Sequence, residues 1–177
     1  MKMIIIGNGI AGISAAKRAR ALDPALEIIL ISDESVLHWS RPALMYLYMG
    51  QMRLKEATPY PVEWWRRKRI ELIQATVTAL DLDTQRVCLD TRRWLHYDRL
   101  LIATGSRPRK GGWPGEDLRG VTGLYHLADL KRLEKWTSGL KRALVVGGGL
   151  VGVELAEMLI SRGCSVTLVV REASFAA

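Results

Sequence analysis

Short apolar runs alternate with helical stretches along this chain. The runs at 3–6 and 28–31 are apolar at every position, which is typical of strands buried on both faces inside a parallel sheet. Mainly apolar runs follow at 99–103, 143–146 and 165–170. Because the order strand, helix, strand occurs near both ends of the chain, the pattern predicts an α/β fold.

Two longer helices are predicted between these strands. The first extends to about Leu22 and ends at Asp23-Pro24, since proline lacks the N–H that a continuing helix needs. The second covers 150–162 and ends at Gly163. Shorter helices are expected at 41–48, 62–68 and 129–136.

The segment between 70 and 97 has a different pattern, with short alternating pieces. Alternation with a period of two predicts strands that bury one face, and Asp81, Asp83 and Thr84 supply turn residues. We therefore expect a small antiparallel excursion built from 70–74, 76–80, 86–89 and 94–97. The Gly- and Pro-rich segment 107–120 is the expected linker.

The unit strand, G-x-G-x-x-G, helix, strand occurs twice. The first copy runs from Gly7 to Gly12, follows a buried strand and opens a helix, and the acidic pair Asp33 and Glu34 comes about twenty residues later. Gly7 suits a tight turn, Gly9 leaves room for a pyrophosphate, and Gly12 allows close packing of the helix. Backbone N–H groups at the helix start can then bind phosphate.

The second copy runs from Gly147 to Gly152 in the same context, with Leu144-Val145-Val146 before it. One such motif is weak evidence because glycines cluster in many turns. Two complete units in one short chain predict two dinucleotide-binding sites of the Rossmann type.

Beyond these motifs, the segment Arg99 to Pro108 contains Ala103-Thr104-Gly105, and Glu154 trails the second glycine motif. With these features the chain resembles the N-terminal part of the pyridine nucleotide–disulfide oxidoreductase superfamily, flavoprotein reductases with two dinucleotide-binding domains. The resemblance implies an FAD-binding domain at 1–110, a linker and short helix at 111–140, and the start of an NAD(P)H-binding domain at 141–177.

The resemblance also implies the binding residues, while the redox chemistry belongs to the cofactors and no metal ligands are expected. In the family, backbone near Thr76-Val77 lies against adenine. The residues expected at FAD are Gly7, Asn8, Gly9, Ile10, Ala11, Gly12, Asp33, Glu34, Arg41, Pro42, Val77, Ala103, Thr104, Gly105 and Arg107. Those expected at NAD(P)H are Gly147, Gly149, Leu150, Val151, Gly152, Glu154 and Arg171.

The stretch Ser40 to Tyr46 indicates the branch of the superfamily. Disulfide reductases keep a redox cysteine pair there, and related oxidases keep one cysteine, but this stretch has none. Its Arg41-Pro42 resembles the RPxL segment of ferredoxin and rubredoxin reductases and of nitrite reductase flavin domains, which implies that Arg41 lies near the FAD pyrophosphate. Tyr46 departs from the lysine of many ferredoxin reductases, which puts tuning of the flavin by a cation in doubt.

Net charge and cysteine count limit the binding partners and the cellular compartment that the sequence predicts. The 177 residues carry a net charge of +8, with one dense basic run, Arg66 to Arg69. A solvated helix face and a docking patch for an acidic protein both fit that run, whereas nucleic acid binding would need basic residues on one recognisable element. No apolar run is long enough to span a bilayer. Cys88 and Cys164 lack metal-ligand or disulfide spacing, which favours a reducing, cytoplasmic setting.

These features predict an FAD-dependent oxidoreductase that takes hydride from NAD(P)H and passes electrons to an acidic carrier such as rubredoxin, ferredoxin or an iron–sulfur subunit. A non-catalytic nucleotide-binding subunit and an NAD(P)H oxidase or disulfide reductase stay open. Arg171 follows the last strand and predicts a preference for NADPH, although Glu172 could bind the ribose instead. His38 is compatible with a flavin or substrate contact and with a plain loop residue.

The chain is also short for the fold that it resembles. A Rossmann-type unit needs further strands after its first β-α-β, whereas only seven residues follow the last predicted strand. We therefore expect the fold to be truncated, with the remainder lying in a further segment, on another chain or in a partner's surface.

Overall fold

The computed structural model describes residues 1–109 and 111–171. They form two compact units: one contains 1–40 and 58–106, and the other contains 41–57 and 107 onward. The assignment of FAD and NAD(P)H to particular residue ranges remains a prediction at this point.

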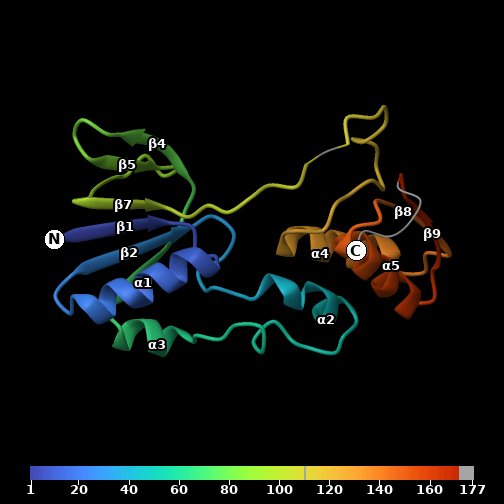
Figure 1. Cartoon of the computed structure of the whole chain (residues 1–177), viewed down its shortest axis with the longest axis horizontal. Coiled ribbons are helices and arrows are strands. Elements are labelled where there is room, and N and C mark those ends of the chain that lie inside the picture. Colours follow the sequence, from blue (N-terminus) through green and yellow to red (C-terminus); the bar gives the residue numbers. More distant parts are fainter. Residues whose placement is uncertain (110, 172–177) are drawn as a thin grey trace. The chain divides into compact units, whose positions relative to one another are not determined.

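A four-stranded parallel sheet forms the centre of the first unit, in the order β3-β2-β1-β7. Its strands are β1 (Lys2–Ile6), β2 (Glu27–Ser32), β3 (Ile70–Gln74) and β7 (Arg99–Ile102). The helices α1 (Ile10–Leu22) and α3 (Val62–Arg67) lie on one face, as Figure 1 shows. The second face is covered by an antiparallel sheet of β4 (Val77–Asp81), β5 (Arg86–Leu89) and β6 (Trp94–His96).

Each face of the parallel sheet has its own hydrophobic core. On the helical side, Ile5, Ile28 and Leu30 pack against Ile13 of α1 and Trp65 of α3. On the other side, β1 and β2 supply a second cluster together with residues of the small sheet: Ile4, Ile29, Ile31, Val87, Leu89 and Leu95. Burial on both sides explains why β1 and β2 read as continuous apolar runs.

One expectation for this unit was wrong. The run 70–74 was assigned to the antiparallel excursion, but β3 pairs in parallel with β2, with Ile28 opposite Ile70. Residues preceding β3 form α3, which makes the connection from β2 a crossover. A short alternating run describes any strand with one well-buried face, so the pattern does not distinguish an edge strand of the main sheet from a hairpin strand.

The small sheet itself matches the expected excursion. β5 pairs antiparallel with both β4 and β6. Asp81 closes the turn between β4 and β5, because its carboxylate accepts hydrogen bonds from the Thr84 hydroxyl, from the Thr84 N–H at 3.0 Å and from the Arg86 guanidinium at 3.0 Å. These bonds lower the pKa of Asp81 to about 2, so the turn carries a charged carboxylate under ordinary conditions.

The second unit contains a two-stranded parallel sheet, β8 (Arg142–Val146) and β9 (Ser165–Val169), joined by α5 (Leu150–Ser161). It also contains the 3-10 turn η1 (Arg41–Ala43), α2 (Leu44–Tyr48) and α4 (Leu127–Thr137). Tyr48 of α2 is fully buried, and its hydroxyl lies 2.7 Å from Thr137 Oγ1. The Arg162 guanidinium, at the end of α5, lies 4.1 Å from the centre of the Tyr48 ring. The contacts with Thr137 and Arg162 together join α2 to α4 and α5.

The described residues give two further findings of absence. Among their helices, none combines the length and the apolar character that a membrane-crossing helix requires. Nor do they contain a group of three or more His, Cys, Asp or Glu side chains arranged to hold a metal ion.

Candidate dinucleotide-binding sites

The first glycine motif lies between the end of β1 and the start of α1. Gly7 has φ +107°, a left-handed conformation that favours glycine, and its N–H donates to Ile31 O of β2 at 2.7 Å. A Cβ at Gly12 would lie 1.9 Å from Gly7 O, whereas a Cβ at Gly9 would meet no atom within 4 Å. The turn is therefore tightly packed on its inner side and open at Gly9.

The start of α1 leaves backbone donors available to an anion. Gly9 is the N-cap residue, and it provides no side-chain hydrogen bond to the helix. Within a helix the first N–H groups have no intrahelical acceptor, which applies here to Ile10, Ala11 and Gly12. Ile10 is 72% exposed. An open position at Gly9 beside uncapped N–H groups fits a pyrophosphate.

Three of the predicted FAD segments lie at the same edge of the parallel sheet. Gly7 follows β1, Asp33 and Glu34 follow β2, and Ala103 to Gly105 follow β7. All strands of this sheet run in parallel, so their carboxyl ends share one edge. Asp33 is exposed and Glu34 is half-buried. Ligands of open α/β sheets bind at this edge, so the arrangement brings a phosphate-binding turn and acidic side chains that could bind ribose to the edge where a dinucleotide is expected.

A second set of polar contacts joins the first glycine turn to the loop after β2. Asn8 Nδ2 donates to Ser35 O at 2.8 Å, and His38 Nδ1 lies 2.8 Å from Asn8 O. Asn8 and His38 are both buried. The sequence placed Asn8 in the glycine motif and His38 in the loop, but a link between them leaves no periodic or spacing signal.

The remaining predicted FAD residues lie at the start of the small sheet or in the second unit. Val77 begins β4 of the small sheet. Arg41 and Pro42 form η1 in the second unit, where Arg41 donates to Tyr125 O at 2.7 Å and lies 4.2 Å from the centre of the Tyr125 ring. Arg107 is exposed in the segment that follows β7. Contacts of these residues with FAD remain predictions.

The second glycine motif repeats the geometry of the first. Gly147 has φ +117°, and its N–H donates to Val169 O of β9 at 2.9 Å. A Cβ at Gly152 would lie 2.0 Å from Gly147 O, and Gly149 is an N-cap residue with open space around it. Leu150 and Val151 form the first turn of α5 and are exposed, while Glu154 is half-buried further along that helix.

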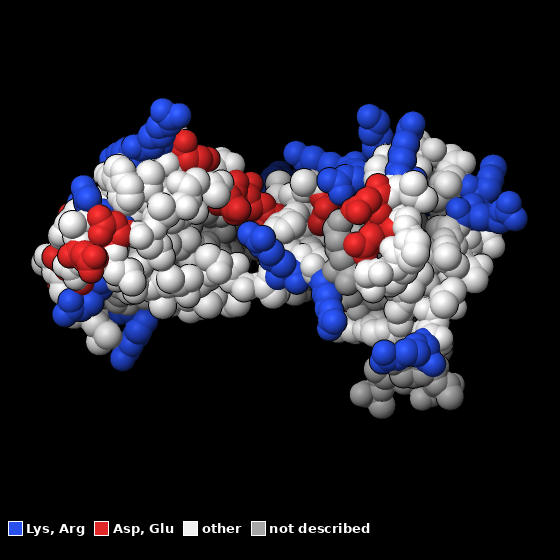
Figure 2. Space-filling view, turned by 90° about the horizontal axis from the view of Figure 1, so that it is seen from above, with Lys and Arg blue, Asp and Glu red and all other residues white. Residues whose placement is uncertain are grey.

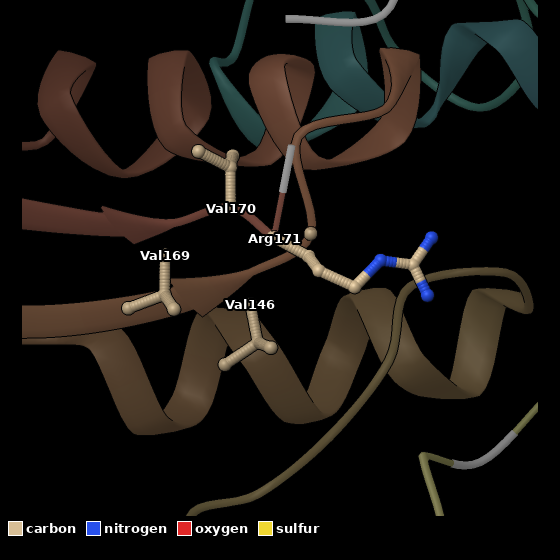
Figure 3. A pocket seen from close by; sticks show the side chains of 5 residues that line it. Val146, Val169, Val170 and Arg171 are labelled. Atoms are coloured by element: carbon tan, nitrogen blue, oxygen red, sulfur yellow. The ribbon is translucent and has the colours of Figure 1, made fainter. Parts of the chain in front are cut away.

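A hollow of about 350 Å³ lies at the carboxyl ends of β8 and β9. Its lining consists of Val146, Gly147, Val169, Val170 and Arg171. In Figure 3 the Arg171 side chain leads away from the three valines and ends in its guanidinium. An apolar wall beside a guanidinium suits an adenosine that carries a phosphate. The alternative ribose ligand, Glu172, lies outside the described residues.

Comparisons with known proteins decide the family. The model of the pyridine nucleotide-disulphide oxidoreductase family matches residues 1–176. The chain belongs to this family. The resemblance found in the sequence and the expected fold class, an α/β fold with Rossmann-type nucleotide-binding units, are thereby confirmed.

Two relatives show how similar this chain is to individual proteins of the family. A probable ferredoxin reductase from Castellaniella defragrans is 38% identical over 95% of this chain and 42% of its own length. The benzene 1,2-dioxygenase system ferredoxin–NAD(+) reductase subunit of Pseudomonas putida is 35% identical over 93% of this chain and 40% of its own length. The chain thus spans about two fifths of the length of these two relatives.

A solved structure with bound NADPH also matches this chain. An engineered, NADPH-bound form of the water-forming NADH oxidase from Lactobacillus brevis matches with a TM-score of 0.86 and 25% identity, over 98% of this chain and 40% of the other. That form carries five substitutions. Among them are an aspartate replaced by alanine and, at the next position, an alanine replaced by arginine.

Proposed function

We propose that this chain is the nucleotide-binding part of a flavin-dependent reductase that takes hydride from NAD(P)H and passes electrons to an external one-electron carrier. The observation that carries the proposal is the repeated turn. Gly7 to Gly12 and Gly147 to Gly152 each place an open glycine and uncapped helix N–H groups at the carboxyl edge of a parallel sheet. FAD, when bound, supplies the conversion between two-electron and one-electron transfer.

The residues of this chain would bind FAD and NAD(P)H and orient them. Ile10, Ala11 and Gly12 would donate N–H groups to the FAD pyrophosphate, and Asp33 or Glu34 would accept the ribose hydroxyls. Leu150, Val151 and Gly152 would serve the pyrophosphate of NAD(P)H in the same way. We assign FAD to the first unit and NAD(P)H to the second from the family order of these domains.

The names of the relatives support a protein carrier as electron acceptor. Two relatives are ferredoxin reductases, and the net charge of +8 suits an acidic carrier. On the face shown in Figure 2, Lys and Arg of each part form separate small groups with Asp and Glu between them. Among the described residues, this face has no single basic stripe, and steering by the net positive charge would not need one.

Absorbance spectra of the purified protein test the proposal. We expect a flavin spectrum that NADPH or NADH bleaches without oxygen and that an added ferredoxin or rubredoxin restores. A protein that binds FAD but is not reduced by either nucleotide would instead be a nucleotide-binding subunit. Rapid restoration by oxygen alone, with no effect of the carriers, would favour an oxidase, the activity of the engineered neighbour.

Electron transfer is expected to proceed without either cysteine. Cys88 lies on β5 of the small sheet, and Cys164 is buried, with its thiol 3.2 Å from Leu140 O. Cys88→Ser combined with Cys164→Ser should leave the rate of flavin reduction by NAD(P)H within about twofold of wild type. Stopped-flow absorbance measures that rate, and Cys164→Ala controls for the cost of a buried hydroxyl. Loss of reduction in a folded, FAD-containing double variant would favour a thiol-dependent reductase.

A further inference from the structure

Two hydrogen bonds join the turn at Asn8 to the loop at 33–38, and each segment donates one of them. The Asn8 side chain donates to Ser35 O at 2.8 Å, and the Asn8 carbonyl lies 2.8 Å from His38 Nδ1. A carbonyl oxygen only accepts hydrogen bonds, so His38 Nδ1 carries the proton in this contact. Asn8 therefore takes part in two hydrogen bonds to one loop, one through its side chain and one through its backbone.

These bonds are shielded from water. His38 is 8% exposed and Asn8 is 9% exposed, and Trp39 beside His38 is 5% exposed. A buried polar group that loses its partner costs more than an exposed one, because water does not replace the bond. The loop after β2 is thus held to the glycine turn by hydrogen bonds whose removal would destabilise this part of the unit.

Both joined segments carry groups that we assign to FAD. The turn precedes the N–H groups of Ile10 to Gly12, and the loop begins with Asp33 and Glu34. We propose that His38 and Asn8 form a clamp that sets the phosphate-binding turn and the ribose-binding loop in fixed relation before FAD binds. His38 is then a positioning residue, which acts through the Asn8 carbonyl. This inference rests on the proposed function, since it concerns the FAD site of the first unit.

A fixed relation between two loops strengthens binding because the ligand does not have to order them. Removing one of the two bonds should loosen both segments together. The two bonds hold the same pair of segments, so their effects should not be additive. A histidine that merely fills space in the loop would show neither property.

Titration of FAD into the purified protein, followed by flavin fluorescence, tests the clamp. We expect His38→Ala and Asn8→Ala each to weaken FAD binding about tenfold, and the double variant to weaken it by clearly less than the product. His38→Asn places an amide N–H where Nδ1–H was, so it should restore the affinity to within about threefold of wild type. His96→Ala, on the exposed side of β6, is the matched control and should have no effect.

Hydrogen exchange without FAD gives a second reading. The Gly7 amide, which donates to Ile31 O, and the Ile13 amide, which donates to Gly9 O, should exchange faster in His38→Ala and at the wild-type rate in His38→Asn. If the wild type binds FAD and His38→Ala binds it equally tightly, the clamp is overturned while the proposed function stands. A wild type that does not bind FAD overturns both. Should His38→Ala fail to fold, Asn8→Ala and His38→Asn carry the same test.

Discussion

Gly12→Ala is expected to destabilise the first unit and to abolish its binding of FAD. A Cβ at this position would lie 1.9 Å from Gly7 O and 3.4 Å from the Ile5 side chain. The nearest atom is backbone, and Gly7 is itself held by its hydrogen bond to Ile31 O at 2.7 Å. The turn must therefore move, and we expect a loss of about 1–3 kcal/mol in the free energy of unfolding.

Gly9→Ala is the matched comparison, because it separates an effect on FAD binding from an effect on the stability of the fold. Gly9 has φ −66°, which alanine adopts readily, and a Cβ there would meet no protein atom within 4 Å. We expect Gly9→Ala to melt like the wild type and yet to bind FAD at least about tenfold more weakly, since its methyl group occupies the approach of the pyrophosphate.

Thermal melting and FAD titration of the two variants give the answer together. The expected result is a lowered melting temperature for Gly12→Ala alone and lowered FAD affinity for both. Wild-type FAD affinity in Gly9→Ala would remove the first glycine motif from the FAD site. A wild-type melting temperature in Gly12→Ala would mean that the turn is looser than its geometry indicates.

Arg171→Ala is expected to remove a preference for NADPH over NADH. Arg171 lies two residues after the end of β9 (Ser165–Val169). The position where NADH-dependent family members usually carry a ribose-binding carboxylate is expected at Val170, directly before it. A guanidinium can hold a 2′-phosphate through two N–H groups. Loss of such charge-assisted bonds costs about 1.5–3 kcal/mol, so kcat/KM for NADPH should fall about 10- to 100-fold while that for NADH stays nearly constant.

The engineered neighbour is an example of the same kind of chemistry in another protein. Its NADPH-bound form has an aspartate replaced by alanine and the next residue replaced by arginine. Directly after β9, this chain has Val170 and then Arg171. The name of one relative points the other way, because it specifies NAD(+). The preference is therefore a proposal that kinetics must decide.

Steady-state kinetics with both nucleotides check it. Arg142→Ala is the control, since it removes the same charge from the amino end of β8, at the opposite edge of the sheet from Arg171. The Arg171 assignment is wrong if the wild type uses NADH at least as efficiently as NADPH and Arg171→Ala changes neither value.

The local elements and the family were predictable from the sequence because their causes are local. A run such as 28–31 is apolar throughout because β2 is covered on both faces. Gly12 and Gly152 are required by contacts five residues back, with Gly7 and Gly147. Short-range constraints of this kind leave a fixed spacing, and a fixed spacing can be recognised in a single sequence.

Pairing between distant segments was decided only in the tertiary structure. β3 was expected to be a hairpin strand, yet it joins the parallel sheet. Its partner β2 lies some forty residues earlier in the chain, so no local pattern indicates this pairing. Surroundings also differ between the two like turns: a Cβ at Gly7 would lie 2.2 Å from Ala103 O of the neighbouring chain segment, whereas one at Gly147 would meet no atom within 4 Å. The contact between His38 and Asn8 spans 30 residues. Such contacts depend on how strands stack side by side, and neither periodicity nor motif spacing encodes that.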